Sequence, residues 1–334
     1  MRNIPALSSS ATRTPGWHGY SVKWSPFDPN LAVCAANENY GIRGRGSLVV
    51  LRRPADGVPL SVSVGQQQIV YTDAFFDVSF SESDPRLVCA AAADGNIIFF
   101  NIISGELITL IRAHAREVSS IEWNPTRTDQ FILSASWDGQ VNLIDPERSA
   151  IVRSFQGHRG IVYSATWAPR LPGILCSTSS DGCVALWDVR SPVGSRPTLM
   201  FRASPTEVLS VDWSKYDCNT LATGSVDAAV SLWDIRHTSR SHQRFFHKKA
   251  VRKVCFSPFF GHVLASVSYD FTTQVHNLAA NRVEVCLVNH TEFAYGLDWN
   301  TAKPGELIDC GWDQLVTVTT MPPDKMPCPL SSAI

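Results

Sequence analysis

The 334-residue chain lacks most of the features that mark membrane proteins, nucleic-acid-binding proteins and enzymes. No apolar run approaches the roughly 20 residues needed to cross a bilayer, and the longest candidate, Ile97–Ile103, is interrupted by Asn101 and is expected to be a buried strand. The net charge of −1 gives no general attraction to polyanions. No nucleophile–base pair, metal-ligand spacing or nucleotide-binding loop is present, so we expect no enzymatic activity, cofactor or metal.

The nine cysteines contain no CxxC pair. Three of them, Cys34, Cys89 and Cys176, each lie nine or ten residues after a bulky aromatic residue, inside a run of small residues. This placement is typical of cysteine used as a small buried hydrophobe. We therefore expect free thiols and a reducing compartment.

What the chain does contain is a module that recurs about every 43 residues. Each copy begins with an aromatic anchor: Trp24, Phe80, Trp123, Trp167, Trp213, Phe256 and Trp299. Six anchors are followed 14 or 15 residues later by an aspartate: Asp94, Asp138, Asp181, Asp227, Asp270 and Asp313. Because a period of 40 to 45 residues marks a propeller blade, we predict an all-β, seven-bladed propeller with four-stranded antiparallel blades.

The copy around Trp167 illustrates the blade. We expect strands over Ile161–Trp167, Ile174–Thr178 and Val184–Trp187 and around Met200, with a Ser-Asp-Gly hairpin turn at residues 180–182. His158, Asp181 and Trp187 resemble the WD-repeat signature. That resemblance implies a buried hydrogen-bonded chain that locks the blade, and this copy is the one expected to carry the whole chain. The other copies are expected to depend more on apolar packing.

The two ends of the chain fall outside the repeat. We expect a flexible N-terminal arm over residues 1–12, the propeller over 13–320, and a proline-rich tail over 321–334. The last blade needs a fourth strand, for which the residues before Tyr20 are the first candidate and the tail is the alternative.

Loops between blades are where a propeller binds ligands. Acids recur six or seven residues before the anchors, Tyr20, Tyr163 and Tyr295 stand four residues before them, and two further aromatics adjoin the turn aspartates. If the blades stack in register, these residues share one rim and suit a basic, amphipathic peptide. The predicted peptide-binding residues are Asp73, Glu117, Glu207, Glu292, Trp137, Tyr163, Tyr269 and Tyr295. Scattered, solvated loop acids are the alternative interpretation.

A stretch from Ile235 to Tyr269 has no acidic residue but seven basic ones. A nucleic acid, an anionic surface and an acidic protein partner are conceivable. No aromatic residues alternate with the charges to form a stacking platform, so we favour a solvated fourth strand and loop and expect no nucleic acid partner. The basic residues are Arg236, Arg240, Arg244, Lys248, Lys249, Arg252 and Lys253.

Several segments are similar to one family within the WD-repeat proteins, the peroxisomal type 2 targeting-signal receptors. They follow one another in order from residue 13 to about 319. They are residues 13–20 (RTPGWHGY), 40–46 (YGIRGRG), 75–78 (FFDV), 136–138 (SWD), 257–259 (SPF), 268–271 (SYDF) and 290–293 (HTEF).

This resemblance implies a cytoplasmic import receptor that cycles to the peroxisome. Members bind an N-terminal helical signal of pattern (Arg/Lys)-Leu-x5-(His/Gln)-(Leu/Ala) on peroxisomal matrix proteins, together with a co-receptor, and the complex meets a docking complex at the peroxisomal membrane. The resemblance places Asp73 and Glu117 where the basic residue of the signal would be held. The rival interpretation is a WD-repeat scaffold of a chromatin or ubiquitin-ligase complex.

Overall fold

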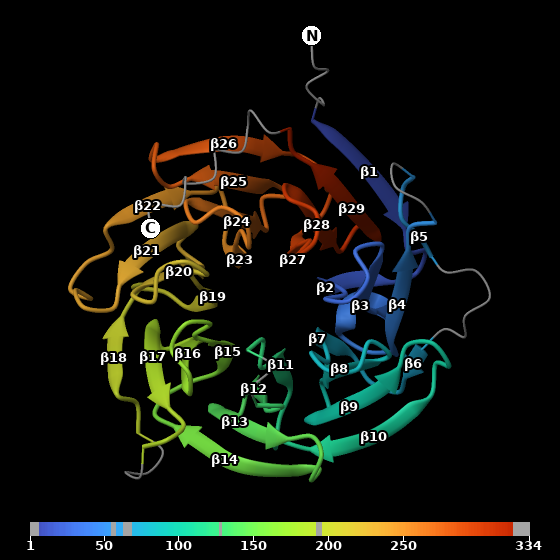
Figure 1. Ribbon diagram of the computed structural model, residues 1–334, viewed down its shortest axis with the longest axis horizontal. Coiled ribbons are helices and arrows are strands. Elements are labelled where there is room, and N and C mark those ends of the chain that lie inside the picture. The colour runs from blue at the N-terminus through green and yellow to red at the C-terminus, as the bar shows by residue number, and fades with distance from the viewer. Residues whose placement is uncertain (1–6, 55–57, 63–68, 127–128, 192–195, 323–334) are drawn as a thin grey trace.

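The computed structural model describes residues 7–54, 58–62, 69–126, 129–191 and 196–322, which form seven sheets arranged in a ring (Figure 1). Pockets lined by the innermost strands mark a central channel. Six sheets have four antiparallel strands, and the first has a fourth position divided between two short strands. The predicted seven-bladed propeller is therefore confirmed. No helix among these residues is long and apolar enough to span a membrane.

The seven innermost strands line the channel, and we number the blades by them from 1 to 7. They are β2 (His18–Trp24), β7 (Phe75–Phe80), β11 (Val118–Trp123), β15 (Val162–Trp167), β19 (Val208–Trp213), β23 (Val251–Phe256) and β27 (Ala294–Trp299). Each of these strands ends on its aromatic anchor. The period read from the sequence is therefore the spacing between the last residues of successive innermost strands.

The remaining strands follow outward. The second strands are β3 (Leu31–Asn37), β8 (Leu87–Ala92), β12 (Ile132–Ser136), β16 (Ile174–Ser179), β20 (Thr220–Ser225), β24 (Val263–Ser268) and β28 (Glu306–Gly311). The third strands are β4 (Gly46–Arg52), β9 (Asn96–Asn101), β13 (Gln140–Asp145), β17 (Cys183–Asp188), β21 (Ala229–Asp234), β25 (Thr273–Asn277) and β29 (Leu315–Thr320). The outer strands are β5 (Ser61–Val62) with β6 (Ile69–Tyr71), β10 (Leu107–Arg112), β14 (Ala150–Gln156), β18 (Leu199–Arg202), β22 (Gln243–Phe246), β26 (Arg282–Leu287) and β1 (Ser8–Arg13).

The apolar core lies between the blades rather than within them. Each hydrophobic cluster joins residues of two neighbouring blades, as where Trp123 of blade 3 packs with Cys89 and Phe99 of blade 2. Cys34, Cys89 and Cys176 are fully buried and free, as the sequence predicts. Stability of one blade therefore depends on both of its neighbours, which suits a closed ring.

Polar contacts join the innermost strands as well. In four blades the side chain just before the anchor accepts the backbone N–H of the next anchor along the ring. The donor–acceptor pairs are Trp24 N to Asp298 Oδ2 (2.9 Å), Trp123 N to Ser79 Oγ (3.1 Å), Trp167 N to Glu122 Oε2 (2.7 Å) and Phe256 N to Asp212 Oδ2 (2.7 Å). These bonds fix the height of one blade relative to the next.

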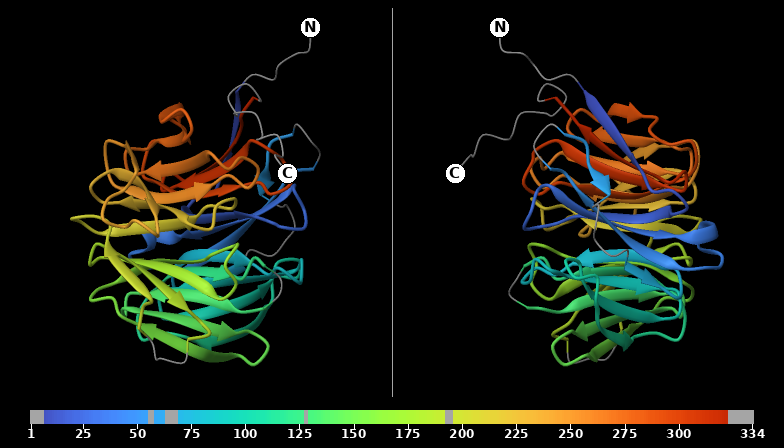
Figure 2. Two further views of the ribbon diagram at one scale, coloured as in Figure 1. Left: turned by 60° about the vertical axis from the view of Figure 1, so that its left-hand side comes forward. Right: turned by 90° about the vertical axis from the view of Figure 1, so that its right-hand side faces the viewer.

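The ring closes through the N-terminal segment. β1 pairs antiparallel with β29 from Ser8–Thr320 to Arg13–Leu315, and Figure 2 shows it lying alongside the last blade. The arm predicted over residues 1–12 is therefore wrong from Ser8 onward, because those backbone groups complete the ladder of blade 7. Residues 1–6 of the predicted arm and 323–334 of the predicted tail lie outside the described residues.

The polar chain in blade 4 runs inward from its turn aspartate. His158 Nδ1 lies 3.1 Å from Asp181 Oδ2, and His158 Nε2 lies 2.9 Å from Ser177 Oγ. The Trp187 indole donates to the same Ser177 oxygen at 2.8 Å. Because an indole N–H can only donate and a carboxylate can only accept, the direction of each hydrogen bond is determined. The Trp187 N–H donates to Ser177, the Ser177 hydroxyl donates to His158 Nε2, and the His158 Nδ1–H donates to Asp181.

The expectation that blade 4 alone carries a complete chain was wrong. In blade 6, His276 occupies the tryptophan position and shares Ser266 Oγ with His247 at 2.7 Å each, while His247 Nδ1 lies 3.2 Å from Asp270. A histidine serves here because its ring nitrogen reaches the serine as an indole N–H does. Burial, together with the nearby His247, lowers the pKa of His276 to about 3, so this ring stays neutral.

Candidate peptide-binding rim

One β-bulge near the start of every innermost strand shapes the channel mouth. In each blade the pairing with the second strand skips one residue, four positions before the anchor. The skipped residues are Tyr20, Phe76, Ser119, Tyr163, Leu209, Arg252 and Tyr295, which we call the bulge ring. A bulge re-aims the side chain that it releases from the ladder.

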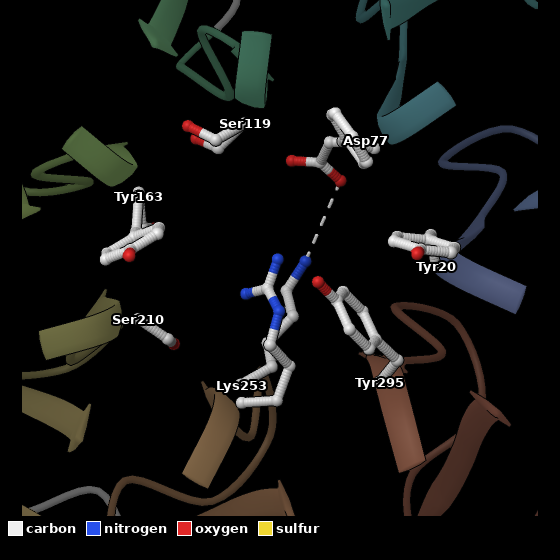
Figure 3. Close-up of a pocket in the computed structure, with 11 residues that line it drawn as sticks. Tyr20, Asp77, Ser119, Tyr163, Ser210, Lys253 and Tyr295 are labelled. Carbon is white, nitrogen blue, oxygen red and sulfur yellow. Dashed lines mark ion pairs between the residues drawn. The ribbon is translucent and has the colours of Figure 1, made fainter. Parts of the chain in front are cut away.

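Six members of the bulge ring line one recess at the mouth of the channel, together with Asp77, Lys253 and three further serines. Figure 3 shows Tyr20, Tyr163 and Tyr295 arriving from three different blades and facing the same space. The sequence offset that grouped these tyrosines therefore reflects a repeated backbone device.

An aromatic cluster surrounds this recess. Tyr20 lies 4.6 Å from Tyr295 and 5.5 Å from Phe76 between ring centroids, and Phe76 stacks on Trp137 at 6.0 Å. On the other side, Tyr269 stacks on Phe293 at 4.5 Å and approaches Tyr295 at 5.9 Å. The cluster thus extends over blades 3, 2, 1, 7 and 6, and Trp137, Tyr269 and Tyr295 of the predicted set belong to it.

Two of the four predicted acids contact tyrosines at the rim. The Tyr163 hydroxyl donates to Glu207, and the Tyr40 hydroxyl donates to Glu292 at 3.4 Å. Burial raises the pKa of Tyr163, and the Glu207 hydrogen bond adds to that effect, so its hydroxyl remains a donor.

The other two acids contact residues of their own loops. The Asp73 carboxylate accepts the backbone N–H of Ala74 at 2.8 Å, and Glu117 Oε2 lies 3.5 Å from Arg116 Nε. All four acids are partly exposed, and each precedes the innermost strand of a different blade. The structure therefore presents carboxylates on blades 2, 3, 5 and 7 beside a shared aromatic surface.

The far mouth of the channel has a different character. It is lined by two lysines and four carboxylates, and each lysine pairs with one aspartate. Lys215 Nζ lies 2.7 Å from Asp212 and Lys23 Nζ lies 3.4 Å from Asp298. Because Asp212 and Asp298 already hold lysines and Glu122 accepts the Trp167 N–H, the aromatic mouth is the better candidate for binding a charged peptide.

The interpretation of the basic stretch was wrong for two residues. Arg252 and Lys253 lie on β23, the innermost strand of blade 6, and line the recess rather than a solvated outer strand. Sequence reasoning missed Arg252 and Phe76, although both stand four residues before an anchor, as Tyr20, Tyr163 and Tyr295 do. It also missed Trp312, which precedes its turn aspartate as Trp137 does and lies 5.2 Å from Phe293.

Nothing in the described ranges groups three His, Cys, Asp or Glu side chains as a metal site would need. The His–Asp pairs belong to the blade locks, where His158 and His247 are almost inaccessible to solvent. The chemistry that the rim offers is therefore recognition: carboxylates for cations, and ring faces for apolar side chains.

Comparison with known proteins agrees with the repeated fold. The family model described as "WD domain, G-beta repeat" matches residues 105–145, 149–188 and 195–234. The peroxisomal targeting signal 2 receptor of Mus musculus is 35% identical over 315 residues, covering 93% of this chain and 97% of the relative. The Homo sapiens receptor of the same name is 36% identical (85% and 87% covered), and that of Saccharomyces cerevisiae is 29% identical (89% and 96% covered).

Proposed function

The chain belongs to the family of peroxisomal targeting signal 2 receptors, and from this membership we propose that it binds the N-terminal type 2 signal of peroxisomal matrix proteins and delivers them for import. The observation that carries the proposal is the similarity along almost the whole propeller to relatives that bear this name. In this function the chain works by binding, as a receptor and not as an enzyme.

The proposed binding surface is the aromatic mouth of the channel. A helical signal presents a cationic residue and apolar residues on one side, and the rim offers carboxylates of four blades beside a continuous aromatic cluster. We assign Asp73 and Glu117 to the basic residue of the signal, because each is partly exposed and is held by contacts within its own loop. Glu207 and Glu292, which already accept tyrosine hydroxyls, would act from the opposite side.

The remaining steps need other proteins. A co-receptor would cover the outward face of the bound signal helix, since a rim contacts only one side of a helix. The loaded complex would then meet the docking complex at the peroxisomal membrane, and the receptor would return to the cytoplasm.

The test is binding of a fluorescent type 2 signal peptide, measured by anisotropy with co-receptor present. We expect low-micromolar affinity or better. Asp73→Lys or Glu117→Lys should weaken binding by about 2–5 kcal/mol, mostly because the cation of the peptide is left without its partner. Glu147→Lys is the matched control, because Glu147 is exposed on the turn after β13, at the opposite ends of the strands.

Unchanged affinity in the Asp73→Lys, Glu117→Lys double variant would overturn the assignment of these two acids. Failure of the unaltered protein to bind any signal peptide or to recover a signal-bearing cargo in a pull-down would overturn the receptor function. A scaffold of a chromatin or ubiquitin-ligase complex predicts that second outcome.

A further inference from the structure

Arg252 is the one cation among the seven residues of the bulge ring. Its guanidinium carbon lies 4.3 Å from the centroid of the Tyr295 ring, and the side chain is partly buried. Within the described parts of the chain, no carboxylate lies at ion-pair distance from this guanidinium. Arg252 donates one hydrogen bond to the Tyr295 side chain and lines the recess, so its remaining N–H donors are left for a ligand there.

The one carboxylate that lines the recess is already committed. Asp77 accepts the Ser21 hydroxyl at 2.6 Å and the Val78 and Ile121 N–H groups at 3.0 Å each, and Lys253 Nζ lies 3.9 Å from it (Figure 3). Lys253 and Asp77 compensate each other. The charge of Arg252 therefore leaves the recess with one net positive charge.

Two serine hydroxyls add donors to the same space. Ser120 Oγ accepts the Ala165 N–H at 3.1 Å, and Ser210 Oγ accepts the Val254 N–H at 2.9 Å. Both side chains are buried and line the recess, and no acceptor for either hydroxyl hydrogen is found among the described residues. Buried hydroxyls ordinarily satisfy their donors, so these two hydroxyl hydrogens and the guanidinium can donate to an acceptor that enters the recess.

We propose that this recess is an anion subsite in which Arg252 receives a carboxylate of the polypeptide lying on the rim. Its cavity volume is about 20 Å³, which has room for the tip of a side chain, whereas a helix with its side chains is about 10–12 Å across. An acidic side chain therefore enters and the helix stays outside. The planar guanidinium suits a carboxylate because it can donate two parallel hydrogen bonds.

The subsite gives the mouth two opposite preferences. Rim carboxylates attract cations at the periphery, and Arg252 attracts an anion at the centre. A bound peptide with both charges can satisfy them in one orientation, so the subsite selects register as well as affinity. The source of the carboxylate rests on the proposed receptor function, but the existence of the anion subsite does not.

The first experiment tests the subsite alone. Sodium acetate is titrated into ¹⁵N-labelled protein at constant ionic strength, while the arginine Nε–Hε signals are followed by NMR. We expect one signal to shift with saturation, and that signal to be missing from Arg252→Gln. Arg240→Gln, which removes an exposed arginine between β21 and β22, should retain the shift. Absence of a saturable shift at the Arg252 signal in the unaltered protein overturns the subsite.

The second experiment tests the source of the carboxylate. In a type 2 signal peptide, each of the five unspecified positions is replaced in turn by Glu and by Gln. At one position Glu should bind at least fivefold tighter than Gln to the unaltered protein, and Arg252→Gln should abolish that preference. Arg252→Lys, which retains the charge, should keep part of it and shows that the fold is intact.

The outcomes separate cleanly. A saturable acetate shift without any Glu preference overturns the polypeptide source and assigns the recess to a free small anion. A Glu preference that survives in Arg252→Gln also overturns the proposal. If the parent peptide does not bind at all, the receptor function and the polypeptide source fail together, and the acetate titration still decides the subsite.

Discussion

The Ser177 hydroxyl of blade 4 provides a quantitative test of the blade lock. Ser177 is fully buried, and its one oxygen links His158 at 2.9 Å and Trp187 at 2.8 Å. Ser177→Ala removes both links while changing the packed volume very little. The indole N–H of Trp187 and Nε2 of His158 would then be buried without partners.

Each such orphaned group costs about 1–3 kcal/mol. Because His158 keeps its bond to Asp181, part of the chain survives, and we expect Ser177→Ala to lower the free energy of unfolding by about 2–4 kcal/mol. Urea denaturation followed by far-ultraviolet circular dichroism measures this change. Hydrogen exchange should show the loss of protection concentrated in β16 and β17, the strands that carry Ser177 and Trp187.

The neighbouring Thr178 supplies the matched control. It is equally buried, but its hydroxyl has no hydrogen-bond partner among the described residues. Thr178→Val should be neutral or stabilise by up to about 1 kcal/mol, because a methyl group replaces an unsatisfied hydroxyl. Equal losses in the two variants, or a loss below about 0.5 kcal/mol for Ser177→Ala, would refute the hydrogen-bond account.

Two further predictions concern blade 7. Burial opposes protonation of His290, but the nearby Asp309 and Asp313 outweigh burial and raise the pKa of His290 to about 10. The stability that protonated His290 adds with these carboxylates is therefore fully present below pH 6.5 and is lost as the pH rises through 10. The difference in free energy of unfolding between the unaltered protein and His290→Gln, at most about 5 kcal/mol, should shrink between pH 7 and 10 in urea titrations; a constant difference would contradict it. Removing residues 1–13 should expose β29 as an edge and produce a concentration-dependent dimer in analytical ultracentrifugation, whereas a monomer as stable as the parent would show that β1 is dispensable.

The architecture could be predicted because the anchors repeat at the period of the fold itself. Trp24 and Trp299 end equivalent strands at the two sides of the ring closure, so counting anchors counts blades. Apolar and turn positions are set locally by strand and hairpin geometry. This is why the strands around Trp167 were predicted to within one residue of their observed ends.

The candidate site was only partly predictable, because a side chain's direction depends on backbone register. Tyr20, Tyr163 and Tyr295 were grouped by their offset, but Arg252 was assigned to a charge run because it lies in a stretch with seven basic residues and no acidic one. Only the bulge in β23 shows that Arg252 faces the channel. Similarly, His276 could not be recognised as a substitute for tryptophan before its distance to Ser266 was known.

The pairing of β1 with β29 also places a constraint in time. Ser9 and Thr319, which contact each other across this pair, are 310 positions apart in the chain. At ~5–20 residues per second, ribosomal synthesis separates their appearance by on the order of 15–60 s. During that interval blades 2 to 6 can assemble, while β1 remains unpaired because its partner strand β29 has not yet been synthesised. The last blade therefore forms only after synthesis has passed Thr320, and until then the nascent ring is open between blades 1 and 7.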